Sequence, residues 1–246
     1  MNASAWRHCF FLLLATVIQT HAAPAQDPGT APPSCGVVFV ADGSGRLRNL
    51  SADLAQAVGD AGLPLQVRSF NWSHGTGRVF LDLRGRAHHQ QKGRQLAECV
   101  VSFHETNPGE PIFLVGHSSG TAVVLAAAEN LPPGSVDGIV LLAPAVSPRY
   151  DLRPALQVSA GGVDSFYSPR DLISRAQVLS GTADGRFSPS AGCAPFVVPD
   201  DGVENDCYSG LRQHRYGLHG EGGHFDCTRR RFLRDNVVPL LGSRDP

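Results

Sequence analysis

The fold prediction depends on one stretch, Pro111-Ile112-Phe113-Leu114-Val115-Gly116-His117-Ser118-Ser119-Gly120. An apolar run of strand length leads into two adjacent serines that stand between two glycines. The following residues, 121–130, are rich in alanine and end before two prolines, which is typical of a helix. The stretch therefore predicts a buried strand, a sharp turn and a helix.

The turn matches the pattern G-x-S-x-G, with Ser118 at its centre. A serine on so sharp a turn has a strained backbone, and glycines two positions before and after it remove side chains that would collide. The first N–H groups of the helix face the space where negative charge develops during attack on an acyl group. We expect Ser118 to be a nucleophile and the Ser119 N–H an oxyanion donor. The alternative is an ordinary helix start capped by Ser118.

A nucleophilic serine on such a turn needs an acid and then a histidine, in that order along the chain. His224 is the best candidate for the base, because it follows two glycines and precedes a helical pattern. The acid should come just after a later strand, which favours Asp171, with the turn aspartate Asp184 as second candidate. We expect His117 to pack near the site or line its pocket, not to act as the base.

Apolar runs and helical patterns alternate along the rest of the chain, which indicates βα units on a parallel sheet. The predicted strands are 36–40, 65–72, 112–115, 138–142 and 163–167, and the predicted helices are 51–59, 91–105, 121–130 and 228–236. The segment 181–209, rich in Gly, Ser, Pro and Asp, should be a surface excursion. The expected fold class is α/β, with a mostly parallel central sheet flanked by helices.

Composition supports a single globular domain, which we place at 35–246. The 246 residues are 42% hydrophobic and 17% charged, enough for one substantial core. With 21 basic and 22 acidic residues the net charge is −1, so we expect no basic field that would attract nucleic acid or an anionic membrane surface.

The first 22 residues look like a secretory signal peptide, with one cation at Arg7, an apolar run and small residues before Ala23. The run is well short of the roughly 20 residues that span a bilayer. We therefore expect a secreted or periplasmic protein without a stable membrane span after cleavage. Residues 23–34, rich in Pro, Gly and Ala, should form a flexible leader.

An oxidising compartment permits disulfides. Cys193 and Cys207 lie in the same loop-like stretch and are expected to pair, whereas Cys99 should be buried in a helix. Three histidines at 214, 219 and 224 share no face of a helix or strand, so we expect no metal site. No organic cofactor is expected either, and the oligomeric state is not predicted.

The order of strand, G-x-S-x-G, helix, Asp171 and His224 resembles that of the α/β-hydrolase superfamily, over roughly residues 36–241. The resemblance implies a Ser-Asp-His triad at the carboxyl edge of a parallel sheet and acyl transfer to water. It also implies a second oxyanion N–H from the loop after an early strand. That loop reads Ala41-Asp42-Gly43-Ser44-Gly45 here, where Gly43 is favoured over Asp42 as the donor.

The chain is also similar to bacterial α/β-hydrolase-like proteins that share W-S-H-G, here Trp72 to Gly75, and L-L-A-P-x-x-S-x-x-Y-D-L-R, here Leu141 to Arg153. The first motif should reach the same sheet edge as Ser118. His74 of this motif is a candidate for lining the pocket, as are Asp42 of the loop after the first strand and His117 of the serine turn. The length leaves no room for a large cap domain, so the pocket should be open and bordered by 181–209 and 149–156.

The predicted function is serine hydrolysis of a carboxylic ester, with a small-molecule or acyl-ester substrate. Two alternatives remain open. A serine peptidase or amidase would use the same three side chains on another leaving group, and a catalytically inactive hydrolase-like binding protein would keep only the fold.

Overall fold

The computed structural model describes residues 36–199, 206–217 and 222–242. Within these ranges six parallel strands form one sheet in the order β2-β1-β3-β4-β5-β6. The strands are β1 (Val37–Ala41), β2 (Gln66–Ser69), β3 (Ile112–His117), β4 (Gly138–Leu142), β5 (Val163–Tyr167) and β6 (Leu211–Arg215). The predicted α/β class with a parallel sheet is confirmed. The predicted signal peptide and leader lie outside the described residues.

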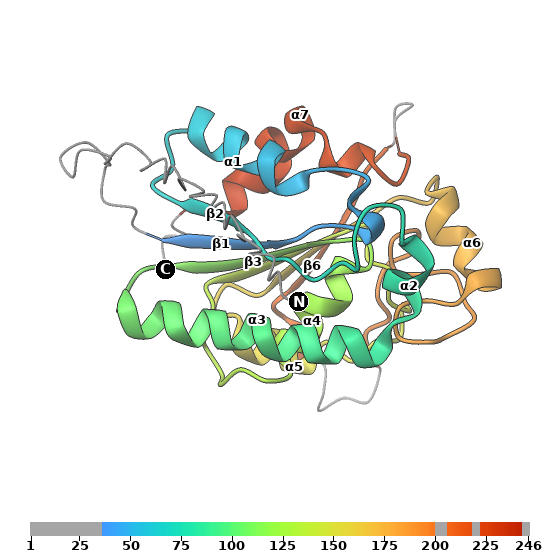
Figure 1. The fold of residues 1–246 in the computed structure, drawn as a ribbon, viewed down its shortest axis with the longest axis horizontal. Helices are drawn as coiled ribbons and strands as arrows, with labels where there is room; N and C mark the ends of the chain where they lie inside the picture. Colours follow the sequence, from blue (N-terminus) through green and yellow to red (C-terminus); the bar gives the residue numbers. More distant parts are fainter. Residues whose placement is uncertain (1–35, 200–205, 218–221, 243–246) are drawn as a thin grey trace, which may run out of the picture. The chain divides into compact units, whose positions relative to one another are not determined.

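Helices cover both faces of the sheet (Figure 1). One face carries α1 (Leu50–Asp60) and α7 (Arg230–Phe232), and the other carries α3 (Arg86–Thr106), α4 (Gly120–Ala128) and α5 (Arg153–Val158). Two further helices, α2 (Val79–Arg84) and α6 (Leu172–Ser180), lie beyond one end of the strands. Among the described helices we find none that is long and apolar enough to cross a membrane.

The central strands are buried on both faces because their side chains feed two separate cores. In β1, Val37 and Phe39 belong to the core under α3 and α4, whereas Val38 and Val40 belong to the core under α1. All residues of β1, β3 and β4 are buried. This explains why these strands are apolar throughout and do not alternate.

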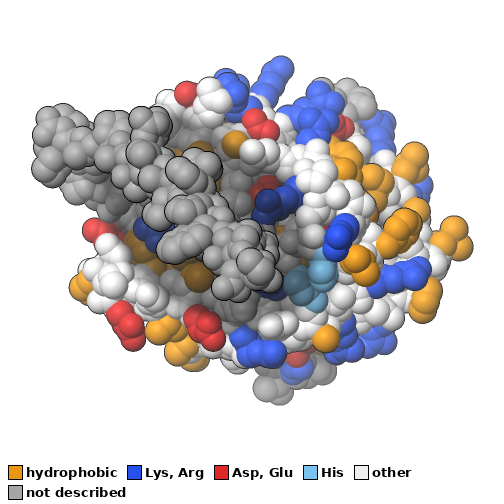
Figure 2. All heavy atoms as spheres, in the orientation of Figure 1, with side chains coloured by type: hydrophobic (Ala, Val, Ile, Leu, Met, Phe, Trp, Pro, Cys, Tyr) orange, Lys and Arg blue, Asp and Glu red, His pale blue; other side chains and the backbone are white. Residues whose placement is uncertain are grey.

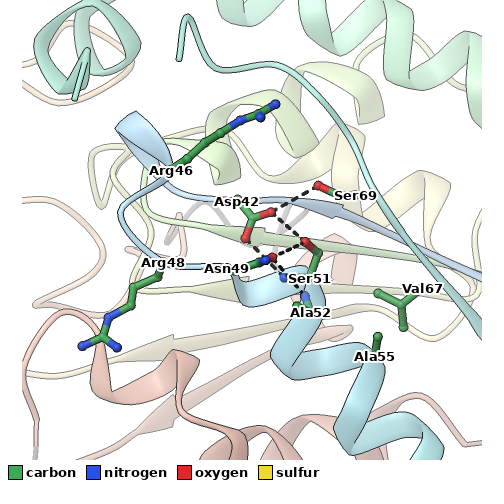
Figure 3. Close-up of a pocket in the computed structure, with 9 residues that line it drawn as sticks. All are labelled: Asp42, Arg46, Arg48, Asn49, Ser51, Ala52, Ala55, Val67 and Ser69. Atoms are coloured by element: carbon green, nitrogen blue, oxygen red, sulfur yellow. Dashed lines mark hydrogen bonds between the residues drawn. The ribbon is translucent and has the colours of Figure 1, made fainter. Parts of the chain in front are cut away.

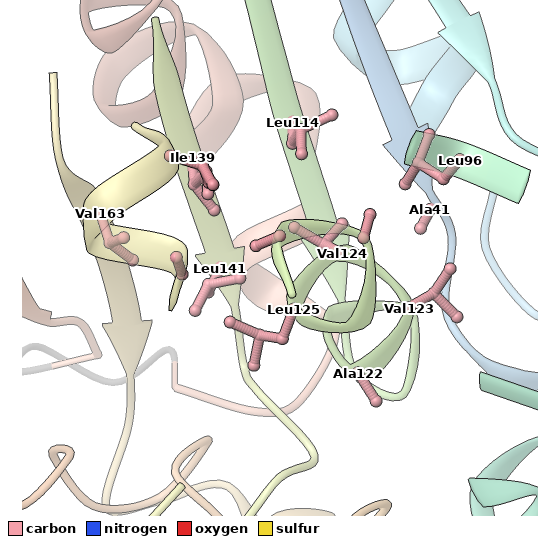
Figure 4. Packing of buried hydrophobic residues seen from close by; sticks show 14 of the residues in the cluster. Ala41, Leu96, Leu114, Ala122, Val123, Val124, Leu125, Ile139, Leu141 and Val163 are labelled. Atoms are coloured by element: carbon pink, nitrogen blue, oxygen red, sulfur yellow. The ribbon is translucent and has the colours of Figure 1, made fainter. Parts of the chain in front are cut away.

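Helix α4 is the most deeply buried helix of the described chain, with all nine residues inside. Figure 4 shows its Val124 and Leu125 packed beside Leu114 of β3 and Leu141 of β4. On its other side α3 approaches closely, because a Cβ added to Gly93 would lie 2.5 Å from Ala126 Cβ. The helix that follows the serine turn is therefore clamped between the sheet and α3.

The strand order reverses next to β1, since β2 pairs with one edge of β1 and β3 with the other. Such a switch point opens a crevice at the carboxyl ends of the two strands, where parallel α/β proteins bind ligands. Ala41 at the end of β1 pairs with Gly116 near the end of β3. The loops that carry Gly43 and Ser118 therefore leave the sheet side by side.

Several elements differ from the sequence-based prediction, which did not include the helices α2, α5 and α6. Strand β6 was not expected, because its sequence Leu-Arg-Gln-His-Arg is polar; Arg212 and His214 pair with the buried Asp164 of β5. The predicted regular helix 228–236 is replaced by three short helical segments. These are the 3-10 helix Asp226–Thr228, α7 and the π-helical segment Leu233–Val237. Pro239, directly beyond, has no N–H to continue a regular helix.

The predicted disulfide between Cys193 and Cys207 is not formed in the structure. Both thiols are free. Cys193 is buried and donates to the Ser190 carbonyl at 3.3 Å, while Cys207 is exposed. Cys99 is only partly buried, because its position on α3 lies at the margin of the core.

The close packing of α3 on α4 predicts opposite effects for the same substitution at two glycines. Gly93→Ala should lower the free energy of unfolding by about 1–3 kcal/mol, because the new methyl group overlaps Ala126. Gly59→Ala on α1 meets nothing within 4 Å and should raise stability by about 0.5 kcal/mol through helix propensity. Urea unfolding monitored by circular dichroism measures both, and equal effects at the two sites would contradict the packing argument.

Candidate active site

Ser118 lies in the turn between β3 and α4 with a φ of +52°. This left-handed conformation is costly for a residue with a Cβ. The Ser118 N–H donates to the Leu142 carbonyl at 3.0 Å, and the Ser118 carbonyl accepts from the N–H groups of Thr121 and Ala145 at 3.1 and 3.2 Å. These three hydrogen bonds hold the strained turn in place.

The two glycines that flank the turn have the steric role expected from the sequence. A Cβ at Gly116 would lie 2.8 Å from Thr121 Cα, where strand and helix approach each other. A Cβ at Gly120 would lie 2.1 Å from the Ala41 carbonyl oxygen, where α4 begins against the end of β1. Neither position therefore accepts a side chain without moving the turn.

The structure brings Ser118, His224 and Asp171 together in one hydrogen-bonded chain. His224 Nε2 lies 2.9 Å from Ser118 Oγ, and His224 Nδ1 lies 2.7 Å from Asp171 Oδ2. All three side chains are buried. With Nδ1–H donating to the carboxylate, Nε2 is free to accept the serine proton, which is the arrangement that general-base catalysis requires.

Asp171 is held from two sides. It caps α6, since Oδ1 accepts from the Ser174 N–H at 2.9 Å and Oδ2 accepts from Ser174 Oγ at 2.7 Å. Burial by itself raises the pKa of Asp171, but the hydrogen bond and charge of His224, followed by the Ser174 bonds, bring the pKa below its ordinary value. The carboxyl group is therefore ionised at neutral pH and fixes the His224 tautomer.

The second candidate for the acid does not approach His224. Asp184 Oδ1 accepts from the Ser147 N–H at 2.8 Å and from Thr182 Oγ1 at 2.6 Å. It thereby fixes the loop that follows β4. The structure thus leaves Asp171 as the carboxylate on His224.

His117 supports the loop of His224. Its ring is buried, and Nε2–H donates to the His224 carbonyl at 3.2 Å. Burial and the nearby His224 lower the pKa of His117 to about 3, so the ring stays neutral. Nδ1 has no hydrogen-bond partner among the described residues. His117 lines the Ser118 pocket, as predicted, but its hydrogen bond goes to the His224 backbone, and the ring nitrogen on Ser118 Oγ is that of His224.

The two predicted oxyanion donors lie on either side of Ser118. A Cβ at Gly43 would be 2.7 Å from His117 Nδ1 and 3.5 Å from Ser118 Cβ, so this backbone runs directly against the serine. Ser119 Oγ and Ser44 Oγ form a hydrogen bond that joins the two loops. Within the described ranges neither the Gly43 N–H nor the Ser119 N–H has an acceptor. Their role as oxyanion donors stays a prediction.

Asp42 does not line the Ser118 pocket, so that prediction is wrong. Figure 3 shows its carboxylate turned toward α1 and β2, where it accepts from Ser51 Oγ at 3.0 Å and from Ser69 Oγ at 3.3 Å. Burial raises the pKa of Asp42, and the Ser51 hydrogen bonds offset this only in part. The Asp42 carbonyl accepts from Trp72 Nε1 at 2.8 Å, which ties the W-S-H-G motif to the turn before Gly43.

His74 does not line the pocket either, because it is bound to a buried carboxylate that the sequence analysis missed. The His74 N–H and ring Nδ1 lie 2.8 and 2.9 Å from Asp82 Oδ1. Asp82 Oδ2 accepts from the Gly45 N–H at 2.7 Å and from Ser73 Oγ at 2.6 Å. Asp82 therefore anchors α2 to the loops that follow β1 and β2.

The pocket around Ser118 is mostly apolar. The residues that line it are Gly43, Ser44, Leu47, Arg48, Val79, Leu83, His117, Ser118, Ile173, Gln177, His224 and Phe225. Its walls come from the loop after β1 and from α2 and α6. Contrary to the prediction, the described residues of 149–156 and 181–209 do not line it. Those loops contribute to a separate polar pocket beside α3. No sequence signal marked Val79, Leu83 or Ile173, because nothing in their local pattern shows which face meets the site.

The Asp82 network predicts a pH-dependent loss of stability. Asp82→Asn should lower the free energy of unfolding by about 2 kcal/mol at pH 7, because one amide oxygen cannot serve donors on both carboxylate oxygens. Although burial opposes ionisation, the hydrogen bonds from Ser73, Gly45 and His74 lower the folded pKa of Asp82 below 3.8. The ionised Asp82 carboxylate therefore stabilises the fold fully above about pH 3.8, its ordinary pKa. This contribution is lost as the pH falls through the pKa of the folded protein.

Urea unfolding of wild type and Asp82→Asn at a series of acidic pH values measures this effect. The difference between their free energies of unfolding should become smaller as the pH is lowered. Glu98→Gln, on the exposed surface of α3, is the matched control and should change stability by less than about 0.5 kcal/mol. A difference that stays constant down to the lowest pH would contradict the network.

Comparison with known proteins places this geometry in a family. The profile of Hydrolase_4, described as serine aminopeptidase, S33, matches residues 32–183. A monoglyceride lipase homolog of Monkeypox virus is 27% identical over 146 residues, which cover 56% of this chain and 48% of that protein. The monoglyceride lipase of Homo sapiens is 36% identical over 77 residues, or 31% of this chain and 25% of that protein. The chain thus spans half or less of the length of these curated relatives.

Solved structures share the fold. An α/β serine hydrolase from Xanthomonas campestris, described as being without a lid, superposes with a TM-score of 0.54 at 17% identity, covering 89% of this chain and 88% of that one. An α/β serine hydrolase homologue from Coxiella burnetii gives a TM-score of 0.50 at 16% identity, covering 87% and 88%. Because the family profile also covers more than half of the sequence, the chain belongs to the Hydrolase_4 (serine aminopeptidase, S33) family of the α/β-hydrolase superfamily.

Proposed function

We propose that the chain is a serine esterase in which Ser118 is the nucleophile, His224 the general base and Asp171 the orienting acid. The observation that carries the proposal is the buried chain of hydrogen bonds, 2.9 Å from His224 to Ser118 and 2.7 Å from His224 to Asp171. The strained turn of Ser118 supports it, because such strain gathers at reactive positions.

The chemistry follows from these positions. Ser118 Oγ bonds to the acyl carbon while its proton passes to His224 Nε2. The resulting oxyanion accepts hydrogen bonds from the N–H groups of Ser119 and Gly43. The bond to the alcohol then breaks, and the alcohol leaves with the proton from His224. Water gives a proton to His224 and attacks the acyl-enzyme, which releases the carboxylic acid and restores Ser118.

The pocket favours an ester with an apolar acyl group over a peptide with a free amino terminus. An aminopeptidase holds a substrate amine, which is a cation at neutral pH. The described lining contains no carboxylate to receive that cation, and it includes Arg48, which would repel it. The apolar side chains of Leu47, Val79, Leu83 and Ile173 instead suit a hydrocarbon chain. The monoglyceride lipases among the relatives agree with this substrate class.

A serine-directed fluorophosphonate tests whether the site is reactive. We expect covalent labelling of wild type at Ser118 and none of Ser118→Ala. Asp171→Asn should slow labelling by on the order of 10³-fold or more, because an amide stabilises the wrong His224 tautomer. Intact-protein and peptide mass spectrometry measure the extent and position of the label.

Two variants control the assignment. Ser119→Ala should still be labelled at Ser118, since only the backbone of Ser119 faces the reaction in this proposal. Asp184→Asn replaces the other candidate acid and should label within about threefold of wild type, because Asp184 contacts Ser147 and Thr182 and not His224. An unreactive wild type would favour an inactive hydrolase-like binding protein.

A substrate panel separates the esterase from the aminopeptidase. We expect wild type to hydrolyse p-nitrophenyl esters, with kcat/KM rising from acetyl to longer acyl chains as apolar contacts with the pocket increase. Amino-acid p-nitroanilides with a free amino group should react far more slowly. Higher kcat/KM on the anilides, abolished by Ser118→Ala, would establish the peptidase instead.

A further inference from the structure

Helix α6 buries polar side chains and exposes apolar ones, which is the reverse of the usual arrangement in a globular protein. Its buried residues are Ser174 and Gln177. Leu172 and Leu179, by contrast, are 72% and 82% exposed, and Ile173 and Val178 are also exposed. Packing within the described chain therefore gives no reason for the apolar residues of this helix.

Exposed apolar side chains also occur in the segments beside α6. On α2, Phe80 is 69% exposed and Leu81 is exposed, while Asp82 is buried together with Leu83. Eight of the eleven exposed large hydrophobic side chains of the described residues lie in the segments 46–48, 78–84 and 170–187. We call these eight the apolar rim: Leu47, Phe80, Leu81, Leu172, Ile173, Val178, Leu179 and Phe187.

The segments of the apolar rim form one surface. Figure 1 shows α2 and α6 near each other at the same end of the sheet, and Arg84 Nε at the end of α2 donates to the Ser180 carbonyl at the end of α6 at 3.2 Å. Leu47 and Ile173 belong both to the rim and to the lining of the Ser118 pocket. Hydrophobic side chains gather over this part of the molecule in Figure 2, with Lys and Arg between them.

The exposed charges of these segments are all positive. Seven arginines in them are exposed: Arg46, Arg48, Arg78, Arg84, Arg170, Arg175 and Arg186. The acidic residues in the same segments are Asp82 and Asp171, which are buried, and Asp184, which is partly buried and hydrogen-bonded. The apolar rim is thus framed by basic groups although the whole sequence has a net charge of −1.

We propose that the apolar rim is a docking surface for an anionic lipid bilayer. Exposed apolar side chains on short helices can enter the boundary between headgroups and acyl chains, while arginines around them meet anionic headgroups. A second copy of the chain fits less well, because it would bring one set of arginines against another. Docking would place the mouth of the Ser118 pocket at the lipid surface. The consequence that the substrate is a lipid ester rests on the proposed function, but the docking itself does not.

Vesicle flotation tests the docking with the Ser118→Ala variant of the 246-residue chain, which removes turnover from the measurement. We expect binding to vesicles that contain phosphatidylglycerol to be at least tenfold stronger than to phosphatidylcholine alone, and to weaken with added salt. Phe80→Ser/Leu179→Ser and Arg175→Glu/Arg186→Glu, each in this background, should reduce binding at least tenfold. Each arginine near the surface contributes about fivefold.

Matched controls lie on α3, away from the rim. Val101→Ser and Arg94→Glu replace an exposed valine and an exposed arginine there and should change binding by less than twofold. Because every protein keeps residues 1–35, differences among them report on the substituted surface. Thermal unfolding by circular dichroism verifies that each variant is folded.

Three results would overturn the docking proposal: absence of vesicle binding, equal binding to neutral and anionic vesicles, or equal losses in the α3 controls. A dimer in light scattering that Phe80→Ser/Leu179→Ser dissociates would show instead that a second copy covers the rim. Lipid binding by a protein that hydrolyses no ester and takes no phosphonate would refute the proposed function while leaving the docking in place.

Discussion

The left-handed backbone of Ser118 is the constraint on which the carboxyl edge of the sheet depends. A residue with a Cβ loses roughly 1–2 kcal/mol in that conformation. Here the loss is offset by hydrogen bonds to Leu142 at the end of β4 and from Ala145 just beyond it. The turn also lies close against β1, since a Cβ at Gly120 would overlap the Ala41 carbonyl. The conformation of one serine thus fixes how the ends of three strands meet.

The rest of the candidate site is arranged around that turn. His224 comes from a loop far along the chain, and the hydrogen bond from His117 to its carbonyl holds the loop next to the strand end that carries Ser118. Asp171 reaches the same point because it begins α6 directly after β5. The switch in strand order next to β1 supplies the crevice. Residues from four separate parts of the sequence can therefore meet without any long insertion.

The parts of this arrangement that could be predicted from the sequence are those with local signals. Continuous apolar runs marked the central strands, and glycines around Ser118 marked the turn. The order of serine, acid and histidine then selected Asp171 and His224. The direction of the Asp42 carboxylate could not be predicted from neighbouring residues. It is determined by hydrogen bonds from Ser51 and Ser69, which only the folded chain brings close to Asp42.

Several of the elements that sequence analysis missed violate the usual pattern. Periodicity assumes that the apolar face of a helix is its buried face. Helix α6 reverses this, and α2 exposes Phe80 and Leu81 although it buries Leu83. Strand β6 is polar because it lies at the edge of the sheet, where Arg212 and His214 pair with a single buried aspartate. Hydrophobicity patterns therefore predict the core of this protein well. They do not predict the apolar rim, whose apolar side chains do not pack into the core.

Helix α6 connects the Ser118 site to the apolar rim. It is attached to the domain through polar contacts, the Asp171 cap with Ser174 above all, so that its apolar side chains are left free of the core. The residue that begins the helix is the hydrogen-bond partner of His224, and the next two, Leu172 and Ile173, belong to the apolar rim. A ligand on the rim can shift the position of Asp171 only if it binds two arrangements of α6 with different affinity. Since the cap and the bond to His224 are already formed in the structure, the shared helix acts to keep the rim and Ser118 in a fixed relation.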